Sequence, residues 1–448
     1  MDTDERIRLA LQERRPEIDQ DDEDDAWAAV RRRADQDRRR RHHPLVAAVA
    51  AVAVVLVGAV VLIRSSGDGR VDDPAGPTDV AADPGPTIPP GDPGTWRTLA
   101  PSPLGARYGS STVWTGHEVL VLGGTDQECP DNARCADVPG GLTDSAAYDP
   151  ATDTWRRLAD APLPFAGASA VWTGDVALVF VTGDDGETTL LAYDPDDDGW
   201  SSRAESPVGF GHEPVWTGQR AVMVAPRLAT DPAERADQVD WAYDPDDDTW
   251  SALPADPADC AENRQGAWAG ERLVVFSRPC LDPGSGGIEP GLYYRTTTFD
   301  PATDTWAGLP DSGVAGWGTW TAHGDKLVSL SIGAFGKAGT EGLAAPTEMG
   351  GILDLASGTW SPLPGPGPDV TSVRDDVGYR GSAGDWVVAG RRMFDPATNQ
   401  WRVMPPPPPG SAAVSSGVWT GTEILLWGGA AEDGSYVATG AAFTPPAA

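Results

Sequence analysis

Short apolar runs, separated by polar turns rich in glycine and proline, recur from Trp96 to the end of the chain. One unit, from Tyr148 to Gly183, reads YDPATDTWRRLADAPLPFAGASAVWTGDVALVFVTG. It holds an aromatic-Asp-Pro turn before a tryptophan, a Pro-rich loop, a strand ending in Trp-Thr-Gly and a second apolar strand. Repeats of about fifty residues with four short strands each are typical of the blades of a β-propeller.

Seven units can be counted in this pattern. The aromatic position is held by Tyr148, Tyr193, Tyr243, Phe299, Leu353 (a degenerate copy), Phe394 and Phe443. The tryptophan position is held by Trp96, Trp155, Trp200, Trp250, Trp306, Trp360 and Trp401. Since Trp96 has no aromatic before it and Phe443 has no tryptophan after it, we expect these two residues to pair. That pairing would close the ring and remove two exposed sheet edges.

The turn residues predict which ends of the strands carry long loops. Asp-Pro favours a tight turn, so the aromatic and the tryptophan should face each other across the hairpin of strands c and d, and Thr-Gly should turn between strands a and b. Both turns then lie on one rim. The opposite rim would carry the long b–c segments, which are residues 125–143, 225–238, 277–291 and 332–349. Insertions confined to one face usually mark a binding face, although long loops can also be merely tolerated.

Residues at the start of the inner strands are expected at the mouth of the central channel. They are Arg107, Tyr108, Phe165, Phe210, His212, Arg264, Trp317, Tyr379 and Arg380. Aromatic rings and guanidinium groups hold sugars and carboxylates by stacking and paired hydrogen bonds, so these residues are candidates for ligand binding. Packing between blades, with the arginines solvated at the rim, is the alternative reading and stays open.

The repeat resembles the kelch family. The similarity covers residues 96 to 448 and rests on aromatic-Asp-Pro-x-Thr-x-x-Trp, a following Leu-Pro, a loop and two strands ending in Gly-Gly. The double glycine is present only at Gly123-Gly124 and Gly428-Gly429, which is a departure from the family pattern. The resemblance implies an all-β, seven-bladed kelch-like propeller over residues 95–448.

The chain before the propeller predicts a membrane anchor. Residues 1–43 include RRRADQDRRRRHH and read as a short helical, Arg-rich tail. Within residues 44–63 lie nineteen apolar residues, Leu45 to Ile63, long enough to span a bilayer as one transmembrane helix. The positive-inside rule keeps the arginines in the cytoplasm and places the propeller outside the cell membrane. Residues 64–94, rich in Pro, Gly and Asp, form the expected linker.

Charge and cysteines agree with this placement. From Arg64 onward there are 22 basic and 54 acidic residues, which is −32 of the total of −34. So negative a surface argues against nucleic acid as a partner. Cys129, Cys135, Cys260 and Cys280 are all on the expected outer side, and an even number there favours disulfides, Cys129–Cys135 and Cys260–Cys280, over free thiols or a zinc site.

For function, the sequence favours a binding propeller, tethered to the membrane, that recognises an extracellular glycan, peptide or envelope protein through its long-loop face. The alternative is a propeller enzyme acting on carbohydrates as an oxidase, epimerase or lyase. We expect no cofactor and no metal site, and no catalytic residue can be named from a linear motif. The tail resembles cytoplasmic tails of actinobacterial envelope proteins, some of them tied to sigma factors, so contact with such a regulator is a further hypothesis.

Overall fold

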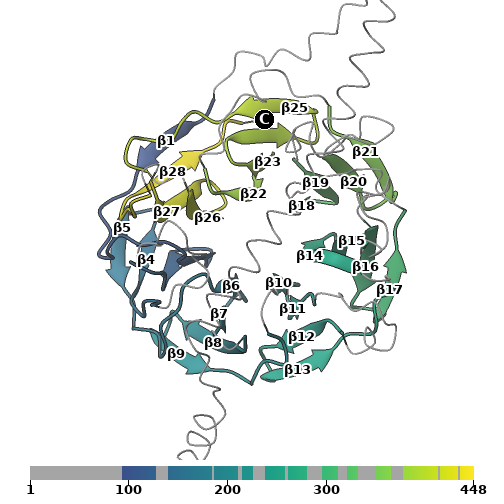
Figure 1. Ribbon diagram of the computed structural model, residues 1–448. Coiled ribbons are helices and arrows are strands. Elements are labelled where there is room, and N and C mark those ends of the chain that lie inside the picture. The colour runs from purple at the N-terminus through teal and green to yellow at the C-terminus, as the bar shows by residue number, and fades with distance from the viewer. Residues whose placement is uncertain are drawn as a thin grey trace, which may run out of the picture. The chain divides into compact units, whose positions relative to one another are not determined.

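The described residues form a β-propeller of seven blades. The structure is a computed structural model and describes residues 93–127, 140–183, 186–209, 214–225, 238–257, 261–279, 295–310, 320–330, 350–364, 377–411, 414–431 and 434–447. All belong to the unit Ala82–Ala448. They form seven four-stranded antiparallel sheets around one axis (Figure 1). The expected all-β propeller is therefore confirmed.

The expected tail, the apolar segment 44–63 and the linker up to residue 92 lie outside the described residues. Within the described ranges, no helix is long and apolar enough to cross a membrane.

Each blade consists of four strands in the order a, b, c and d. Blade 1 comprises β2 (Ser111–Trp114), β3 (Val119–Leu122), β4 (Ser145–Asp149) and β5 (Thr154–Arg157). Blade 2 comprises β6 (Ser169–Trp172), β7 (Ala177–Thr182), β8 (Thr188–Asp194) and β9 (Gly199–Ser202). Blade 3 comprises β10 (Pro214–Trp216), β11 (Ala221–Met223), β12 (Trp241–Asp244) and β13 (Thr249–Ala252). Blade 4 comprises β14 (Ala261–Ala269), β15 (Arg272–Pro279), β16 (Arg295–Asp300) and β17 (Thr305–Gly308).

Blade 5 comprises β18 (Trp320–His323), β19 (Lys326–Ser329), β20 (Gly351–Asp354) and β21 (Thr359–Pro362). Blade 6 comprises β22 (Arg380–Ala383), β23 (Trp386–Ala389), β24 (Arg392–Asp395) and β25 (Gln400–Val403). Blade 7 comprises β26 (Val414–Trp419), β27 (Ile424–Ala430), β28 (Gly440–Thr444) and, as its outer strand, β1 (Thr95–Thr98). The a strands contact one another in sequence around the axis, and β26 meets β2 to complete the circle.

The ring closes as the sequence predicts. Strand β1 pairs antiparallel with β28, and Trp96 lies opposite Phe443. Their ring centroids are 5.0 Å apart. The first and last strands of the propeller thus share one sheet, so β28 is paired on both sides and β1 forms the outer strand of blade 7.

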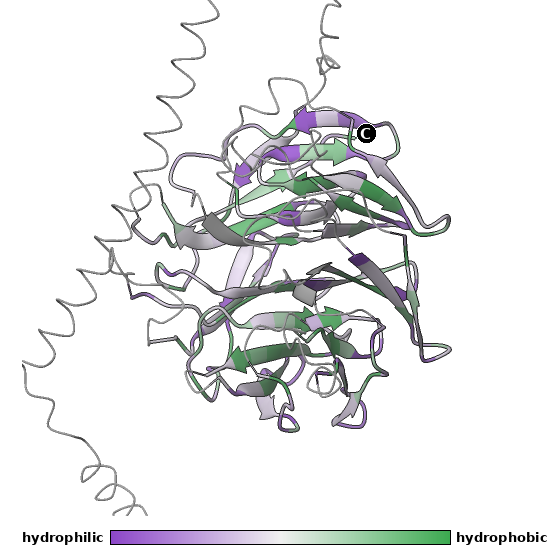
Figure 2. Cartoon of the chain, turned by 45° about the vertical axis from the view of Figure 1, so that its right-hand side comes forward, coloured by the Kyte–Doolittle hydropathy of each residue, from purple (hydrophilic) through white to green (hydrophobic). Residues whose placement is uncertain are grey.

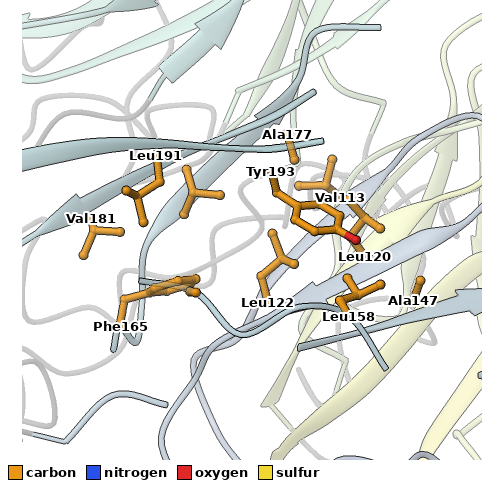
Figure 3. Packing of buried hydrophobic residues seen from close by; sticks show 12 residues of the cluster. Val113, Leu120, Leu122, Ala147, Leu158, Phe165, Ala177, Val181, Leu191 and Tyr193 are labelled. Atoms are coloured by element: carbon orange, nitrogen blue, oxygen red, sulfur yellow. The ribbon is translucent and has the colours of Figure 1, made fainter. Parts of the chain in front are cut away.

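Apolar side chains fill the space between neighbouring blades. Figure 2 shows the hydrophobic residues concentrated along the strands of the blades. Between blades 1 and 2, Leu120 and Leu122 pack with Leu191 and Tyr193 (Figure 3). All four are essentially excluded from solvent. Because each sheet buries both faces in this way, no blade has a core of its own, and stability comes from the junctions between blades.

A tryptophan hydrogen bond crosses every junction. In each blade the tryptophan of strand d lies opposite the aromatic or leucine of strand c, as Trp155 lies opposite Tyr148. Its indole Nε1 donates to a backbone carbonyl just after the outer strand of the preceding blade. The seven distances lie between 2.8 and 3.3 Å, and the acceptors are Ala100, Ala159, Ala204, Pro254, Pro310, Pro364 and Pro405.

An aspartate reinforces three of these junctions. In blade 2, Asp198 closes the c–d turn with φ at 48° and accepts the Tyr193 hydroxyl at 2.7 Å. The same oxygen accepts the N–H of Ala159 from blade 1 at 2.9 Å. Blades 1 and 3 repeat this arrangement with the trios Tyr148, Asp153 and Ala100, and Tyr243, Asp248 and Ala204.

In blades 4 to 7 the two donors to this aspartate, the tyrosine hydroxyl and the alanine N–H, are both missing. The aromatic position there has no hydroxyl, since it is Phe299, Leu353, Phe394 or Phe443. The residue whose carbonyl accepts the tryptophan is a proline and has no N–H. The aspartate acceptor is therefore not needed in these blades. Its turn position is held by Asp304, Gly358 and Asn399 in blades 4, 5 and 6. The two kinds of junction are thus distinguishable in the sequence.

The trio can be tested by one matched pair of variants. Asp198→Ala removes an acceptor of two hydrogen bonds, whereas Asp304→Ala removes an aspartate that has no hydrogen-bond partner among the described residues. Both positions have a positive φ, so the backbone penalty for alanine is shared. We expect Asp198→Ala to lower the free energy of unfolding by about 2 kcal/mol more than Asp304→Ala. Equal losses in denaturant titrations would contradict this role of the trio.

Candidate functional site

The two rims of the propeller differ in the length of their connections. The a–b turns span two or four residues and the c–d turns span four. The b–c connections reach 22 residues between β3 and β4 and 21 between β19 and β20. We call the rim made of a–b and c–d turns the short-turn rim, and the rim made of b–c and d–a connections the long-connection rim. The four expected long b–c segments all join strands b and c on the latter.

Arg107 is the most heavily bonded predicted residue on the long-connection rim. Its guanidinium donates to both carboxylate oxygens of Asp144, at 2.8 and 2.9 Å, and to the carbonyl oxygen of Gly123 at 3.1 Å. The residue is 2% exposed. The paired hydrogen bond from Arg107 holds the pKa of Asp144 below its ordinary value. A bidentate pair of this kind fixes the orientation of both side chains.

The backbone of Arg107 joins blade 1 to blade 7. Its carbonyl oxygen accepts the N–H of Gly429 at 2.8 Å, and its N–H donates to Val437 at 3.4 Å. Gly428 and Gly429 both have positive φ, and a Cβ on Gly428 would lie 3.1 Å from the carbonyl oxygen of Arg107. The double glycine therefore allows the two backbones to approach closely.

Two tyrosines stack next to this contact between blades 1 and 7, since Tyr108 and Tyr436 adjoin Arg107 and Val437 in the chain. The rings of Tyr108 and Tyr436 lie 5.8 Å apart at an angle of 23°. Both residues are half-buried. Tyr108 exchanges two backbone hydrogen bonds with Thr125, and Tyr436 forms a β-bridge with Ala430. Backbone contacts therefore hold each ring in place, and the pair offers aromatic surface and phenol groups on the long-connection rim. We call Tyr108 and Tyr436 the tyrosine pair.

Arg264 lies in a separate, fully buried ionic network at the junction of blades 3 and 4. It donates to both oxygens of Asp240, at 2.6 and 2.9 Å, and to Asp256 at 2.6 Å. It also donates to the carbonyl oxygen of Ala225 at 2.6 Å. The Arg264 side chain has no exposed surface and the two carboxylates almost none. In this structure the network joins the ends of β11 and β12 to β14, and a ligand contact by Arg264 stays a prediction.

The other predicted residues lie in different surroundings. Phe165 is buried between blades 1 and 2, against Leu122 (Figure 3). The Tyr379 hydroxyl donates to the carbonyl oxygen of Ser382 at 2.7 Å, and burial raises its pKa. Arg380 is exposed at the start of β22. Phe210, His212 and Trp317 lie outside the described residues, as do Cys129, Cys135, Cys260 and Cys280.

The structure therefore brings together only part of the predicted set. Arg107 and Tyr108 share one place on the rim, while Arg264 occupies another. Sequence reasoning missed Asp144 and Tyr436, because their partners come from other segments of the ring. The only signal for Tyr436 was its position shortly after Gly428-Gly429, in the same relation as the loop after Gly123-Gly124. Within the described ranges, no three His, Cys, Asp or Glu side chains gather as a metal site.

Comparisons with known proteins add little to this description. No protein-family model matches the chain. No curated protein matches it either. Among solved structures, the chain is similar to one described as "Structure of YjhT", with 16% sequence identity and a TM-score of 0.40. The similarity covers 77% of this chain and 97% of that chain.

The Arg107–Asp144 pair can be tested against an exposed arginine beside the same carboxylate. Arg157 lies 3.7 Å from Asp144 and is 59% exposed, compared with 3% for the Arg107 side chain. Arg107→Met should lower the free energy of unfolding by about 2 to 4 kcal/mol, since it leaves Asp144 without its buried partner. Arg157→Met should cost less than about 0.5 kcal/mol. Urea titrations of the two variants decide the matter, and similar costs would show that Arg107 is not a structural bridge.

Proposed function

We propose that the protein is a binding propeller that recognises its ligand on the long-connection rim. The observation that carries this proposal is the difference between the rims. The turns of the short-turn rim have only two or four residues in every blade, whereas the length of the connections varies widely only on the opposite rim. Loops of varied length on a rigid scaffold are the usual form of a recognition surface.

The tyrosine pair provides the best-defined contact surface on that rim. Both residues are partly exposed, and their positions are fixed by backbone hydrogen bonds and by the neighbouring Arg107–Asp144 pair. Fixed aromatic rings bind with little loss of side-chain entropy, and they stack on sugar rings or apolar side chains while the phenols form hydrogen bonds. This chemistry suits a glycan, a peptide or an envelope protein.

The proposal includes a place in the cell and a family. We take the chain to be a kelch-repeat protein held by one helix at residues 44–63, with its tail in the cytoplasm and the propeller outside. The apolar run, the arginines before it and the acidic propeller after it support this arrangement. A tail on the cytoplasmic side would be available to a regulator such as a sigma factor.

Binding can be tested with the full chain in detergent on arrays of glycans and peptides. For any ligand retained by the parent, Tyr108→Ala combined with Tyr436→Ala should weaken binding at least about tenfold, because the aromatic contact surface is lost. The control is His117→Ala on the short-turn rim, which should bind as the parent does. Near-ultraviolet circular dichroism checks that both variants are folded. Loss of binding in His117→Ala alone would place the site on the short-turn rim and refute the proposal.

Topology has its own test. Protease added to intact cells should remove the propeller and leave the residues before the apolar segment protected, since only the part outside the membrane is accessible. Antibodies against tags at the two ends of the chain would follow the fragments. Protection of residues beyond 95 in intact cells, with cleavage only after lysis, would refute the outer placement.

A further inference from the structure

Two junctions of the ring, between blades 7 and 1 and between blades 1 and 2, hold an arginine near a tyrosine by the same ion pair. Between blades 7 and 1, Arg97 donates through Nε and Nη2 to the two carboxylate oxygens of Glu423, at 2.9 and 2.6 Å. Its Nη1 donates to the Tyr148 hydroxyl at 2.8 Å. Between blades 1 and 2, Arg156 binds Glu118 through the same two nitrogens, at 3.0 and 2.7 Å.

The junction between blades 2 and 3 lacks both members of this ion pair. Ser201 follows Trp200 in blade 2, where Arg156 follows Trp155 in blade 1. Val176 ends the a–b turn of blade 2, where Glu118 ends that of blade 1. A hollow of about 430 Å³ is lined there by Val176, Trp216 and other residues of these turns. It is open on the short-turn rim, between the a–b turns of blades 2 and 3.

An arginine nevertheless lies at this junction, two residues after Ser201 in the chain. Arg203 lines the hollow. The pKa of Asp248 is lowered first by the hydrogen bond from Tyr243, and further by the positive charge of Arg203. Arg203 therefore stands near the tyrosine and aspartate of blade 3, as Arg97 and Arg156 do near those of blades 1 and 2.

Among the described residues, no carboxylate forms an ion pair with the guanidinium of Arg203. Its Nε is buried, and among the described residues no acceptor lies within hydrogen-bond distance of it. Because Nε has almost no accessible surface, a ligand would bind to the terminal nitrogens Nη1 and Nη2, which have no hydrogen-bond partner within the described ranges. In the two closed junctions a carboxylate accepts from Nη2 as well as from Nε, so the molecule itself shows which group fits.

From this missing ion pair we infer that the hollow between blades 2 and 3 is a binding site for a small carboxylate ligand, with Arg203 as its main contact. The ligand's carboxylate would pair with the Arg203 guanidinium as Glu423 and Glu118 pair with Arg97 and Arg156 in the neighbouring junctions. This inference does not rest on the proposed function, because the hollow lies on the opposite rim.

The charges around the hollow limit the size and charge of the ligand. Arg220 also lines it but is 3.3 Å from Asp244, so its charge is partly matched. Asp175 and Asp246 are further lining residues. With three aspartates beside two arginines, a polyanion would be repelled. The site suits one carboxylate, such as the C-terminus of a peptide or the acid group of a uronic sugar.

Thermal melts of the full chain in detergent test the site directly. N-acetylglycinate represents a peptide C-terminus and glucuronate an acidic sugar, while N-acetylglycinamide and glucose are their neutral controls. With ionic strength held constant by sodium chloride, a binding carboxylate at ten times its Kd should raise the melting temperature by about 2 °C. The neutral controls should leave it unchanged. A shift with one acid only identifies the source, and a shift with both shows that the carboxylate alone is recognised.

Two variants decide whether Arg203 carries the effect. Arg203→Gln should abolish the shift, whereas Arg157→Gln, a change at an exposed arginine of blade 1, should retain it. Val176→Glu supplies the missing carboxylate from the protein, so it should raise the melting temperature without ligand and abolish the response to added acid. This second variant gives an answer even if Arg203→Gln folds poorly. No shift with either acid in the parent, or a full shift in Val176→Glu, would overturn the inference.

Discussion

A single indole N–H, donated across each junction, is the contact on which this ring depends. Each tryptophan packs on the residue opposite it within its own blade and bonds to the backbone of the blade before it, so it joins the interior of one blade to its neighbour. The bond is made in all seven junctions, whether the acceptor residue is alanine or proline. Around it the junctions differ. Three add the tyrosine, aspartate and alanine trio, while four omit both added donors together. At these positions the sequence either pairs the tyrosine hydroxyl and the alanine N–H with an aspartate or removes both donors, in keeping with the cost of an unpaired buried donor.

This contact also explains why the two rims have different freedom to vary. The c–d turn holds the aspartate or its substitute next to the tryptophan, and changes in its length would move both. The b–c connections carry no such repeated constraint, so they differ in length from blade to blade without altering the strands. Even there some positions are fixed, because Arg107 and the double glycine of blade 7 hold the tyrosine pair between two blades. Rigid supports and variable loops occur side by side on this face.

Much of the fold could be predicted from the sequence because its signals are local and repeated. The pairing of Tyr148 with Trp155 follows from the turn between them, and the closure by Trp96 and Phe443 follows from counting the repeat. Side-chain partners were harder to predict. Arg107 and Arg264 were proposed as ligand contacts, yet the acids that bind them, Asp144, Asp240 and Asp256, come from other strands and loops. Such pairs depend on how closely two backbones approach, and no periodicity in the sequence records that distance.

The closing strand also sets an order of events during synthesis. Strand β1 is made first and its partner β28 last, and Trp96 and Phe443 are 347 positions apart (443 − 96). At ribosomal rates β1 has no partner for roughly 20 to 70 s after it is made. The tryptophan it carries is also without its acceptor, Pro405, for most of that time. Blades 1 to 6 can dock one after another as they emerge, but the circle is completed only when the last forty residues have been added. Folding of this protein therefore ends at the strand with which its propeller begins.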